Sequence, residues 1–279
     1  MNIIVERRHD LQLFVCHLQK AERSAATVEK YLRDVERFLT FQQNQPITKE
    51  STIAYKNYLV EKGYRISSIN SMLASLNGYL AFLGLTDCKV RSLRTQRKVY
   101  AAPEKELSRE EYLRLLDAAG NDAQLKLLLQ TICSTGIRIS ELCYFTVENL
   151  KRGEVTVRCK NKTRTVLVPG ELKKRLLDFA KGRGIRRGSI FVTRSGKPLD
   201  RSNVWARMKR LCAAAKVDPG KVFPHNLRKL FARCFYAISK DIAKLADVLG
   251  HSSIETTRIY IMTTGREHRR QLERLHLLI

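Results

Sequence analysis

The sequence has few of the residues that mark disordered or fibrous proteins. Among its 279 residues there are only 14 glycines and 6 prolines. This composition excludes collagen-like, low-complexity and disordered chains, and a hydrophobic content of 44% is enough for one or two buried cores. At roughly 100–200 residues per domain, a chain of this length predicts two domains.

Long apolar runs are also missing. Stretches such as LKLLLQTIC from Leu125 are about half of the roughly 20 residues that a membrane span needs. The start, MNIIVERRHD, places two arginines and a histidine where a signal peptide would continue its apolar stretch. We therefore expect a soluble, cytoplasmic protein that does not bind membranes.

Patterns for disulfides and metals are absent from the sequence. The seven cysteines are odd in number, scattered and never spaced C-x-x-C, and none of the six histidines lies near a cysteine cluster. We interpret the cysteines as buried thiols in a reducing compartment and expect no zinc. The sequence holds no acidic cluster suited to Mg²⁺ either, so we expect no metal and no nucleotide cofactor.

Acidic residues are about half as common as basic ones. The chain has 52 Lys and Arg against 27 Asp and Glu, for a net charge of +25. A basic surface attracts phosphate backbones because binding releases counterions, so this charge favours a nucleic-acid partner. A ribosomal-type protein, or a basic surface that serves only solubility, is the alternative at this point.

Residues 1–88 predict a small helical domain. Apolar residues recur at i, i+3, i+4 and i+7 in four segments between residues 9 and 85, without strand-like alternation. From 89 to 106 this period lapses and basic residues accumulate, which indicates a linker. A linker that lies along DNA and an ordinary solvated linker fit this segment equally well.

Residues 107–279 predict a second, mixed domain. It opens with a capping box from Ser108 to Glu111, and its first long apolar helix breaks at Gly136. Residues 154–168 alternate around the polar tip KNKTR, which predicts a β-hairpin. Further helices are expected around 171–181, 202–215, 224–239 and 240–249, followed by a pair through Tyr260 and 267–278. The fold class is therefore α+β, mainly helical with a small antiparallel sheet.

Two short segments place basic side chains near helix N-termini. In TGIRISEL, Gly136 ends one helix and Arg138 stands at the start of the next, where both the guanidinium and the helix dipole stabilise an anion. In FPHNLR, His225 and Arg228 lie on one helix face and both reach a single phosphate. A surface pair of Arg138 with Glu141 is an equal alternative for the first segment, and an isolated H-x-x-R occurs by chance in many proteins.

The hairpin tip is the third segment with candidate functional residues. Lys160, Lys162 and Arg164 lie within five residues, and a mobile hairpin could carry one of them into a groove. Taken alone, this segment fits a solvated basic turn better.

The fourth segment is LGHSSIETTRIY. Gly250 ends a helix, and the run from Ser252 to Glu255 is a second capping box, so the next helix starts almost at once. His251 therefore lies in a tight bend, with Tyr260 about two turns farther on. Taken alone, a buried tyrosine on a helix face is normally part of the core.

Together the four segments resemble the tyrosine recombinase (phage integrase) family, and most closely its Xer-type members. The matching strings are TGIRISEL, the basic hairpin with Lys160, PHNLR and LGHSSIETTRIY, in the family's order. The resemblance covers essentially the whole chain and implies a SAM-like core-binding domain before the catalytic domain. An Arg, Lys, His-x-x-Arg, His and Tyr rarely occur in this order and spacing by chance, which removes the separate alternatives.

The resemblance implies a role for each matching residue. Tyr260 is the nucleophile, and Arg138 and Arg228 grip the non-bridging oxygens of the scissile phosphate. His225 is the general acid or base, and His251 donates a hydrogen bond to the phosphate.

The remaining matches are less direct. Lys160 is the best match to the lysine that protonates the leaving 5′-oxygen, with Lys162 as its competitor, because CKNK is one residue shorter than the common GKGxK form. Glu141 matches an acidic position that supports the first arginine. Lys229 stands where the family commonly has histidine.

The implied activity is site-specific recombination of double-stranded DNA, for integration, excision or resolution. Such an enzyme cuts through a 3′-phosphotyrosyl intermediate and reseals through a Holliday junction, as a homo-tetramer on DNA. The amphipathic tail, about 267–279, resembles the segment that neighbouring subunits exchange, and an intramolecular cap is the alternative. Two rival functions are a non-catalytic, architectural DNA-binding protein and a type IB topoisomerase-like enzyme that relaxes supercoils.

Overall fold

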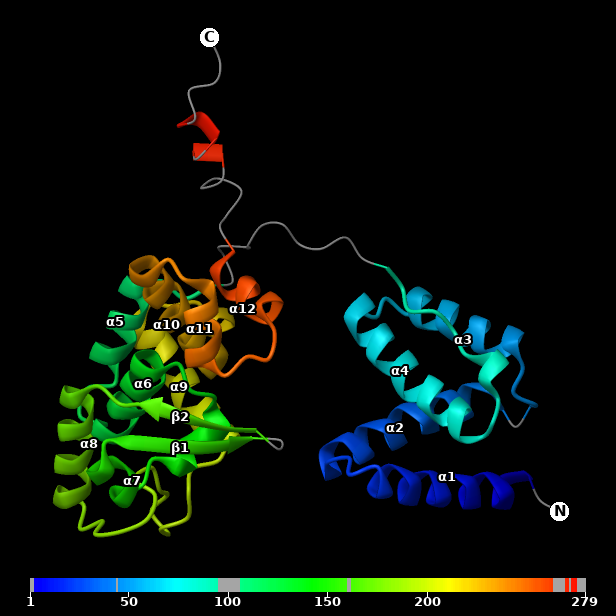
Figure 1. The fold of residues 1–279 in the computed structure, drawn as a ribbon, viewed down its shortest axis with the longest axis horizontal. Coiled ribbons are helices and arrows are strands. Elements are labelled where there is room, and N and C mark those ends of the chain that lie inside the picture. The colour runs from blue at the N-terminus through cyan, green and yellow to red at the C-terminus, as the bar shows by residue number, and fades with distance from the viewer. Residues whose placement is uncertain are drawn as a thin grey trace. The chain divides into compact units, whose positions relative to one another are not determined.

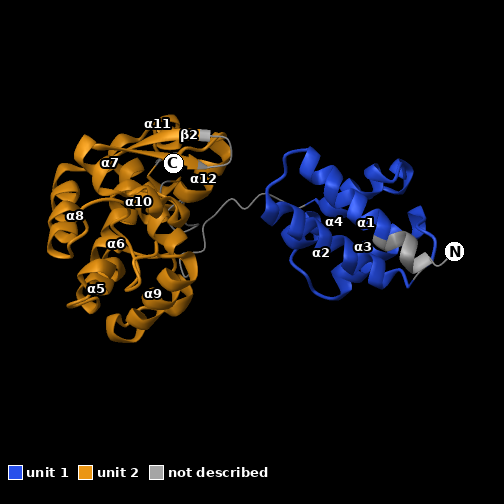
Figure 2. Cartoon of the chain, turned by 90° about the horizontal axis from the view of Figure 1, so that it is seen from below, with its two compact units in different colours: residues 1–97 blue, residues 98–279 orange. Residues whose placement is uncertain are grey.

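The computed structural model describes residues 3–43, 45–94, 106–159, 162–262, 269–270 and 272–274. The chain divides into two compact units, residues 1–97 and 98–279 (Figures 1 and 2). Within the described ranges, no helix is both long and apolar enough to cross a membrane.

The first unit is a helical bundle with an aromatic core. Phe14 packs edge-on against Tyr79, and Phe38 packs in the same way against Tyr55. The four-helix pattern expected from the apolar period is confirmed, since the described part contains α1 (Ile3–Lys20), α2 (Ala25–Phe41), α3 (Lys49–Glu61) and α4 (Ile66–Phe82), followed by the short 3₁₀ helix η1 (Thr86–Cys88).

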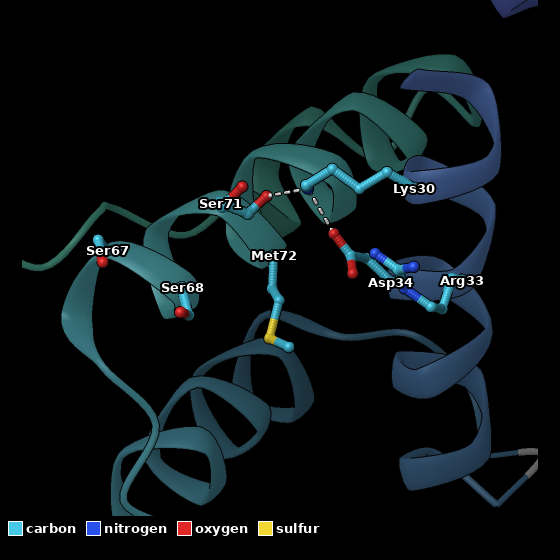
Figure 3. Close-up of a pocket in the computed structure, with 7 residues that line it drawn as sticks. All are labelled: Lys30, Arg33, Asp34, Ser67, Ser68, Ser71 and Met72. Carbon is cyan, nitrogen blue, oxygen red and sulfur yellow. Dashed lines mark hydrogen bonds and ion pairs between the residues drawn. The ribbon is translucent and has the colours of Figure 1, made fainter. Parts of the chain in front are cut away.

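A buried polar network ties α2 to α4 (Figure 3). The buried Asp34 accepts a hydrogen bond from Lys30 Nζ at 2.6 Å, drawn in Figure 3. It accepts another from Ser75 Oγ at 2.9 Å. Lys30 Nζ also donates to Ser75 Oγ at 3.0 Å and to the carbonyl of Ser71 at 3.1 Å. Because an ammonium has three donors, Lys30 is saturated within the bundle and serves helix packing, although it lines a pocket beside Arg33.

The segment after η1 continues along the bundle. The side chain of Asn77 pairs with the backbone N–H and carbonyl of Val90, and Asn70 pairs in the same way with Leu93. We expected the linker to begin at residue 89, but 89–94 pack on α4 because these two amides replace the missing backbone partners. Residues 95–105, the rest of the expected linker, lie outside the described residues.

The second unit has one large hydrophobic core, which runs from Leu107 to Leu230. A smaller cluster joins α10, α11 and α12, which lie side by side in Figure 1. The expected mainly helical fold with a small antiparallel sheet is confirmed. The described helices are α5 (Arg109–Ala118), α6 (Ala123–Thr135), η3 (Ile139–Tyr144), α7 (Val147–Arg152), α8 (Gly170–Gly182), α9 (Arg201–Ala215), η4 (Pro219–Lys221), α10 (Pro224–Ser239), α11 (Ile242–Leu249) and α12 (Ile254–Ile261).

The sheet is a two-stranded hairpin of β1 (Glu154–Cys159) and β2 (Lys162–Leu167). Its register pairs Glu154 with Leu167 and Cys159 with Lys162, so residues 160 and 161 join the strands. Lys160 lies outside the described residues, as does most of the expected tail helix at 267–279.

Two glycines end the helices that lead into the candidate site. Gly136 closes α6 with φ of 62°, and Gly250 closes α11 with φ of 64°, both in the left-handed region that favours glycine. The helix after Gly250 starts one residue later than expected, because Ser253 rather than Ser252 is its N-cap and accepts from the backbone N–H of Glu255.

Candidate active site

The expected site residues converge from four separate segments of the second unit. Arg138 follows the end of α6, His225 and Arg228 lie on the first turns of α10, His251 lies in the bend between α11 and α12, and Tyr260 lies on α12. The structure joins His225, Arg228, His251 and Tyr260 through direct contacts, and Arg138 lines one pocket with His225 and Arg228. Lys160, the remaining expected residue, is outside the described part.

Arg228 lies at the centre of the site and is 1% exposed. Its guanidinium donates to the carbonyls of Gly136 and Leu249, which are at the C-terminal ends of α6 and α11, the latter at 2.7 Å. Helix C-termini carry partial negative charge, so both helix ends stabilise this buried cation. Burial and then the nearby charge of Arg138 lower the pKa of Arg228 to about 10, which leaves it charged at neutral pH.

Arg138 is the more accessible of the two arginines, with 36% of its side chain exposed. It is the N-cap of η3, and its Nη1 atom lies 3.1 Å from Glu141 Oε1. Its Nη2 atom donates to the carbonyl of Gly250 at 3.4 Å. The expected pair with Glu141 is thus present, although Glu141 is buried, and it is compatible with a role of Arg138 as a site residue.

Glu141 is a buried carboxylate, 1% exposed, that holds several parts of the site. Besides the side chain of Arg138, it accepts the Arg138 backbone N–H at 2.8 Å and the Arg164 guanidinium at 2.7 Å. Arg164 also donates to the carbonyl of Val248 at 2.8 Å. A buried charge needs such compensation, and here two guanidiniums provide it.

The position of Arg164 corrects one expectation. We placed it at the hairpin tip as a candidate for reaching a groove, yet its side chain is largely buried beneath the bend at Gly250. The alternation of side chains along a strand could have predicted this position. Arg164 pairs with Val157 and lies two residues before Val166, and both valines are buried. Arg164 therefore belongs to the inward face of the hairpin.

The two histidines both meet the ring of Tyr260. The rings of His225 and Tyr260 lie 5.2 Å apart at 84°, and those of His251 and Tyr260 lie 5.2 Å apart at 77°. Burial and then the charge of Lys229 lower the pKa of His225. Burial and then the charge of Arg228 lower the pKa of His251 to about 4, so both imidazoles are neutral at pH 7.

Tyr260 is mostly buried and packs against Ala232, Leu245 and Leu249. Its hydroxyl interacts with the guanidinium of Arg228. Tyr260 therefore packs in the core, as a tyrosine on a helix face normally does, and it also contacts the other site residues. The site combines one phenol, two neutral imidazoles and two guanidiniums, which suits nucleophilic attack on a phosphate.

Two residues of α9 extend the site, and sequence reasoning missed them. A pocket of about 460 Å³ is lined by Arg138, His225 and Arg228 together with Arg201 and Trp205. Trp205 is 51% exposed, which is unusual for an aromatic side chain on a packed helix. A cation and an aromatic face beside a phosphate-binding site suit contact with nucleic acid. The amphipathic pattern of α9 alone does not mark these positions.

In the ranges that the structure describes, no cluster of three or more His, Cys, Asp or Glu side chains could hold a metal ion.

Comparison with known proteins extends to both units. Residues 105–266 match the model of the phage integrase family, and residues 11–85 match that of the phage integrase N-terminal SAM-like domain. The tyrosine recombinase XerA of Pyrococcus furiosus is 29% identical over 280 residues, which cover 98% of this chain and 96% of that protein.

Solved structures agree with these matches. A crystal structure of XerA recombinase aligns with a TM-score of 0.54 and 25% identity over 98% of this chain and 99% of that one. A lambda integrase tetramer bound to a Holliday junction has the same fold, with a TM-score of 0.74 at 18% identity over 93% of this chain and 78% of that one. With its catalytic-domain match spanning more than half of its residues, the chain belongs to the phage integrase family and is a tyrosine recombinase.

Proposed function

We propose that this protein cuts and rejoins double-stranded DNA at a specific site through a covalent bond between Tyr260 and a 3′-phosphate. The observation that carries the proposal is the contact of the Tyr260 phenol with two neutral imidazoles and the Arg228 guanidinium. This arrangement holds a nucleophile, a candidate proton acceptor and fixed positive charge within one set of contacts.

In the first step, the Tyr260 oxygen forms a bond to phosphorus and the bond between phosphorus and the 5′-oxygen breaks. A neutral phenol is a weak nucleophile, so its proton must leave as the bond forms. We propose that His225, which is neutral and whose ring contacts that of Tyr260, accepts this proton. The leaving 5′-oxygen takes a proton, for which the family resemblance offers Lys160. In the second step, the 5′-hydroxyl of another strand attacks the phosphotyrosine, and Tyr260 leaves.

Arg138 and Arg228 supply the fixed charge for this reaction. Negative charge grows on the phosphoryl oxygens during attack, and oriented donors that need no rearrangement stabilise it best. Glu141 and the helix-end carbonyls hold the two guanidiniums in place before DNA arrives. The phosphodiester energy is kept in the phosphotyrosine, so resealing needs no ATP.

The assembly follows from the same chemistry. Complete recombination between two duplexes breaks four strands, one at each active site, and we propose a homo-tetramer on a Holliday junction. The lambda integrase structure, a tetramer bound to a Holliday junction, supports this assembly. We also propose that the tail, about 267–279, is exchanged between subunits, because its Leu272, Leu275 and Leu278 repeat at helical spacing. The described cysteines are free thiols, which fits a reducing, cytoplasmic location. The expectation that they are buried was wrong for Cys16, Cys143 and Cys234, which are exposed.

The test is covalent trapping on a nicked duplex that carries the recombination site. We expect Tyr260→Phe to bind DNA like the unchanged protein but to lose the covalent adduct by about 10⁴-fold or more, because no nucleophile remains. Tyr236→Phe is the matched control, since Tyr236 packs in the same cluster and should keep the adduct. Adduct formation by Tyr260→Phe would exclude the mechanism, and site-independent supercoil relaxation would favour a topoisomerase.

A further inference from the structure

We infer that Thr257 is a positioning residue that holds His251 as a hydrogen-bond acceptor for Arg228. In this arrangement the ring carries its hydrogen on Nδ1 and presents a lone pair at Nε2. The inference rests on the proposed function, because its consequence for catalysis requires that Arg228 act on a phosphate. It also replaces the donor role that the family resemblance implies for His251 with an acceptor role in the DNA-free protein.

The contact between Arg228 and His251 determines which ring nitrogen carries the hydrogen. Arg228 Nη2 lies 3.0 Å from His251 Nε2. A guanidinium has only donors, so Nε2 must accept and cannot carry a hydrogen. Because burial and nearby arginines keep His251 neutral at pH 7, its single N–H must be on Nδ1.

The Nδ1–H of His251 has a hydrogen-bond acceptor on α12. His251 Nδ1 lies 2.8 Å from Thr257 Oγ1, so the ring donates to the threonine hydroxyl. Thr257 is fully buried. It lies on α12 three residues before Tyr260, about one turn along the same helix. The hydrogen bond therefore connects the helix of the nucleophile to the arginine at the centre of the site.

This connection helps to orient Arg228. Its guanidinium donates to the carbonyls of Gly136 and Leu249 and to the ring of His251, and it also interacts with the Tyr260 hydroxyl. The Nε–H is buried and has no protein acceptor among the described residues. The guanidinium is thus oriented by partners on several sides before DNA binds.

The opposite tautomer would disturb this arrangement. A hydrogen on Nε2 would point at a guanidinium N–H, so that two donors would face each other beside a buried charge. A valine at position 257 has the shape of threonine but no acceptor, so it would leave the Nδ1–H buried without a partner and remove one of the two contacts that favour this tautomer. A serine would keep the hydroxyl and is the matched control.

The direct test is ¹⁵N NMR of the histidine rings in the full-length, DNA-free protein at pH 7. Loss of one ring system in His251→Gln assigns the signals. We expect a protonated Nδ1 and an unprotonated Nε2 in the unchanged protein and in Thr257→Ser, and a shift of both nitrogens toward the other tautomer in Thr257→Val. A protonated Nε2 in the unchanged protein would overturn the inference even if Thr257→Val failed to fold. An unaltered tautomer in a folded Thr257→Val would also overturn it.

Adduct formation on the nicked duplex gives the catalytic readout. We expect Thr257→Val to slow it by about 10–100-fold, the usual effect of losing a side chain that orients a site residue, with DNA affinity unchanged. Thr257→Ser should stay near the unchanged rate. Equal rates in the two variants would contradict the positioning role. The tautomer is read without DNA, so absence of any adduct would count against Tyr260 chemistry and leave the tautomer result intact.

Discussion

The two arginines of the site are both expected to bind the scissile phosphate, but they contribute differently to the stability of the fold. Arg228 is buried and binds the C-terminal carbonyls of α6 and α11. Arg138 is about one-third exposed, and its main partner Glu141 also has Arg164 as a second cation. We therefore expect Arg228 to contribute to stability as well as catalysis, and Arg138 to contribute mainly to catalysis.

Lysine substitutions separate the contributions to stability and to catalysis, because lysine keeps the positive charge but lacks the planar set of N–H donors of a guanidinium. We expect Arg228→Lys to lower the free energy of unfolding of the second unit by about 2–3 kcal/mol, since buried carbonyls lose their donors. Arg138→Lys should lower it by less than about 1 kcal/mol. Trp205 is the single tryptophan, so its fluorescence in urea titrations follows this unit. Equal losses in both variants would contradict the distinction.

The histidines make stability depend on pH. The pKa of His251 is about 4 in the folded protein, against an unfolded value near 6.5, and the pKa of His225 is also lowered. The unfolded state therefore binds more protons between these values, and stability that is present above pH 6.5 is lost as the pH falls toward 4. Because His251 is partly exposed, we expect its share to be about 1–2 kcal/mol after solvent screening.

His251→Gln removes this titration while it keeps a polar side chain. Urea unfolding at pH 7 and pH 4.5 should show a smaller loss of stability on acidification in the variant than in the unchanged protein. The His251 contribution would be disproved by an equal loss in both proteins.

At the scale of elements, the bend between α11 and α12 depends on close packing with the hairpin. A Cβ atom at Gly250 would overlap the side chain of Arg164, whose guanidinium is held by Glu141 and by the carbonyl of Val248. The arginine therefore cannot move aside without losing buried partners. The positive φ of Gly250 adds a backbone penalty for any other residue.

Gly184 provides a matched control for this bend. It has a φ of 68°, and nothing lies within 4 Å of an added Cβ. We expect Gly184→Ala to cost about 1 kcal/mol through its backbone alone, and Gly250→Ala to cost about 3 kcal/mol or more and to reduce adduct formation. Urea unfolding and the trapping assay measure both effects. Similar costs for the two variants would show that the contact with Arg164 is unimportant.

Local signals explain which elements could be predicted. Apolar period, capping residues and the Gly136 and Gly250 breaks depend only on neighbouring residues, and the helices and the hairpin follow them. Local rules were less reliable at helix starts, where Ser253 rather than Ser252 caps α12. They also missed 89–94, which is held by side chains of α4.

At the scale of the molecule, the site is built from contacts that no local pattern contains. Arg228 reaches Gly136 across 92 residues, and Arg164 reaches Val248 across 84. The resemblance to a family predicted which residues meet, since their order and spacing are characteristic of it. It did not predict the buried position of Arg164, the Thr257 hydrogen bond or the α9 residues in the pocket, because these depend on packing within this chain.

The basic residues behind the net charge of +25 have different roles. Few of the basic residues take part in the proposed chemistry, and some, such as Lys30 and Arg164, are bound by protein partners. The remaining surface cations suit a long polyanion such as DNA, whose binding they would make sensitive to salt.

The most direct measurement of the central claim is the identity of the residue that carries DNA in the trapped adduct. Digestion with trypsin and nuclease followed by mass spectrometry would locate the nucleotide remnant. The proposed mechanism predicts a 3′-linked remnant on Tyr260, in the peptide of residues 259–266. A remnant on any other side chain, or a link through a 5′-phosphate, would contradict it.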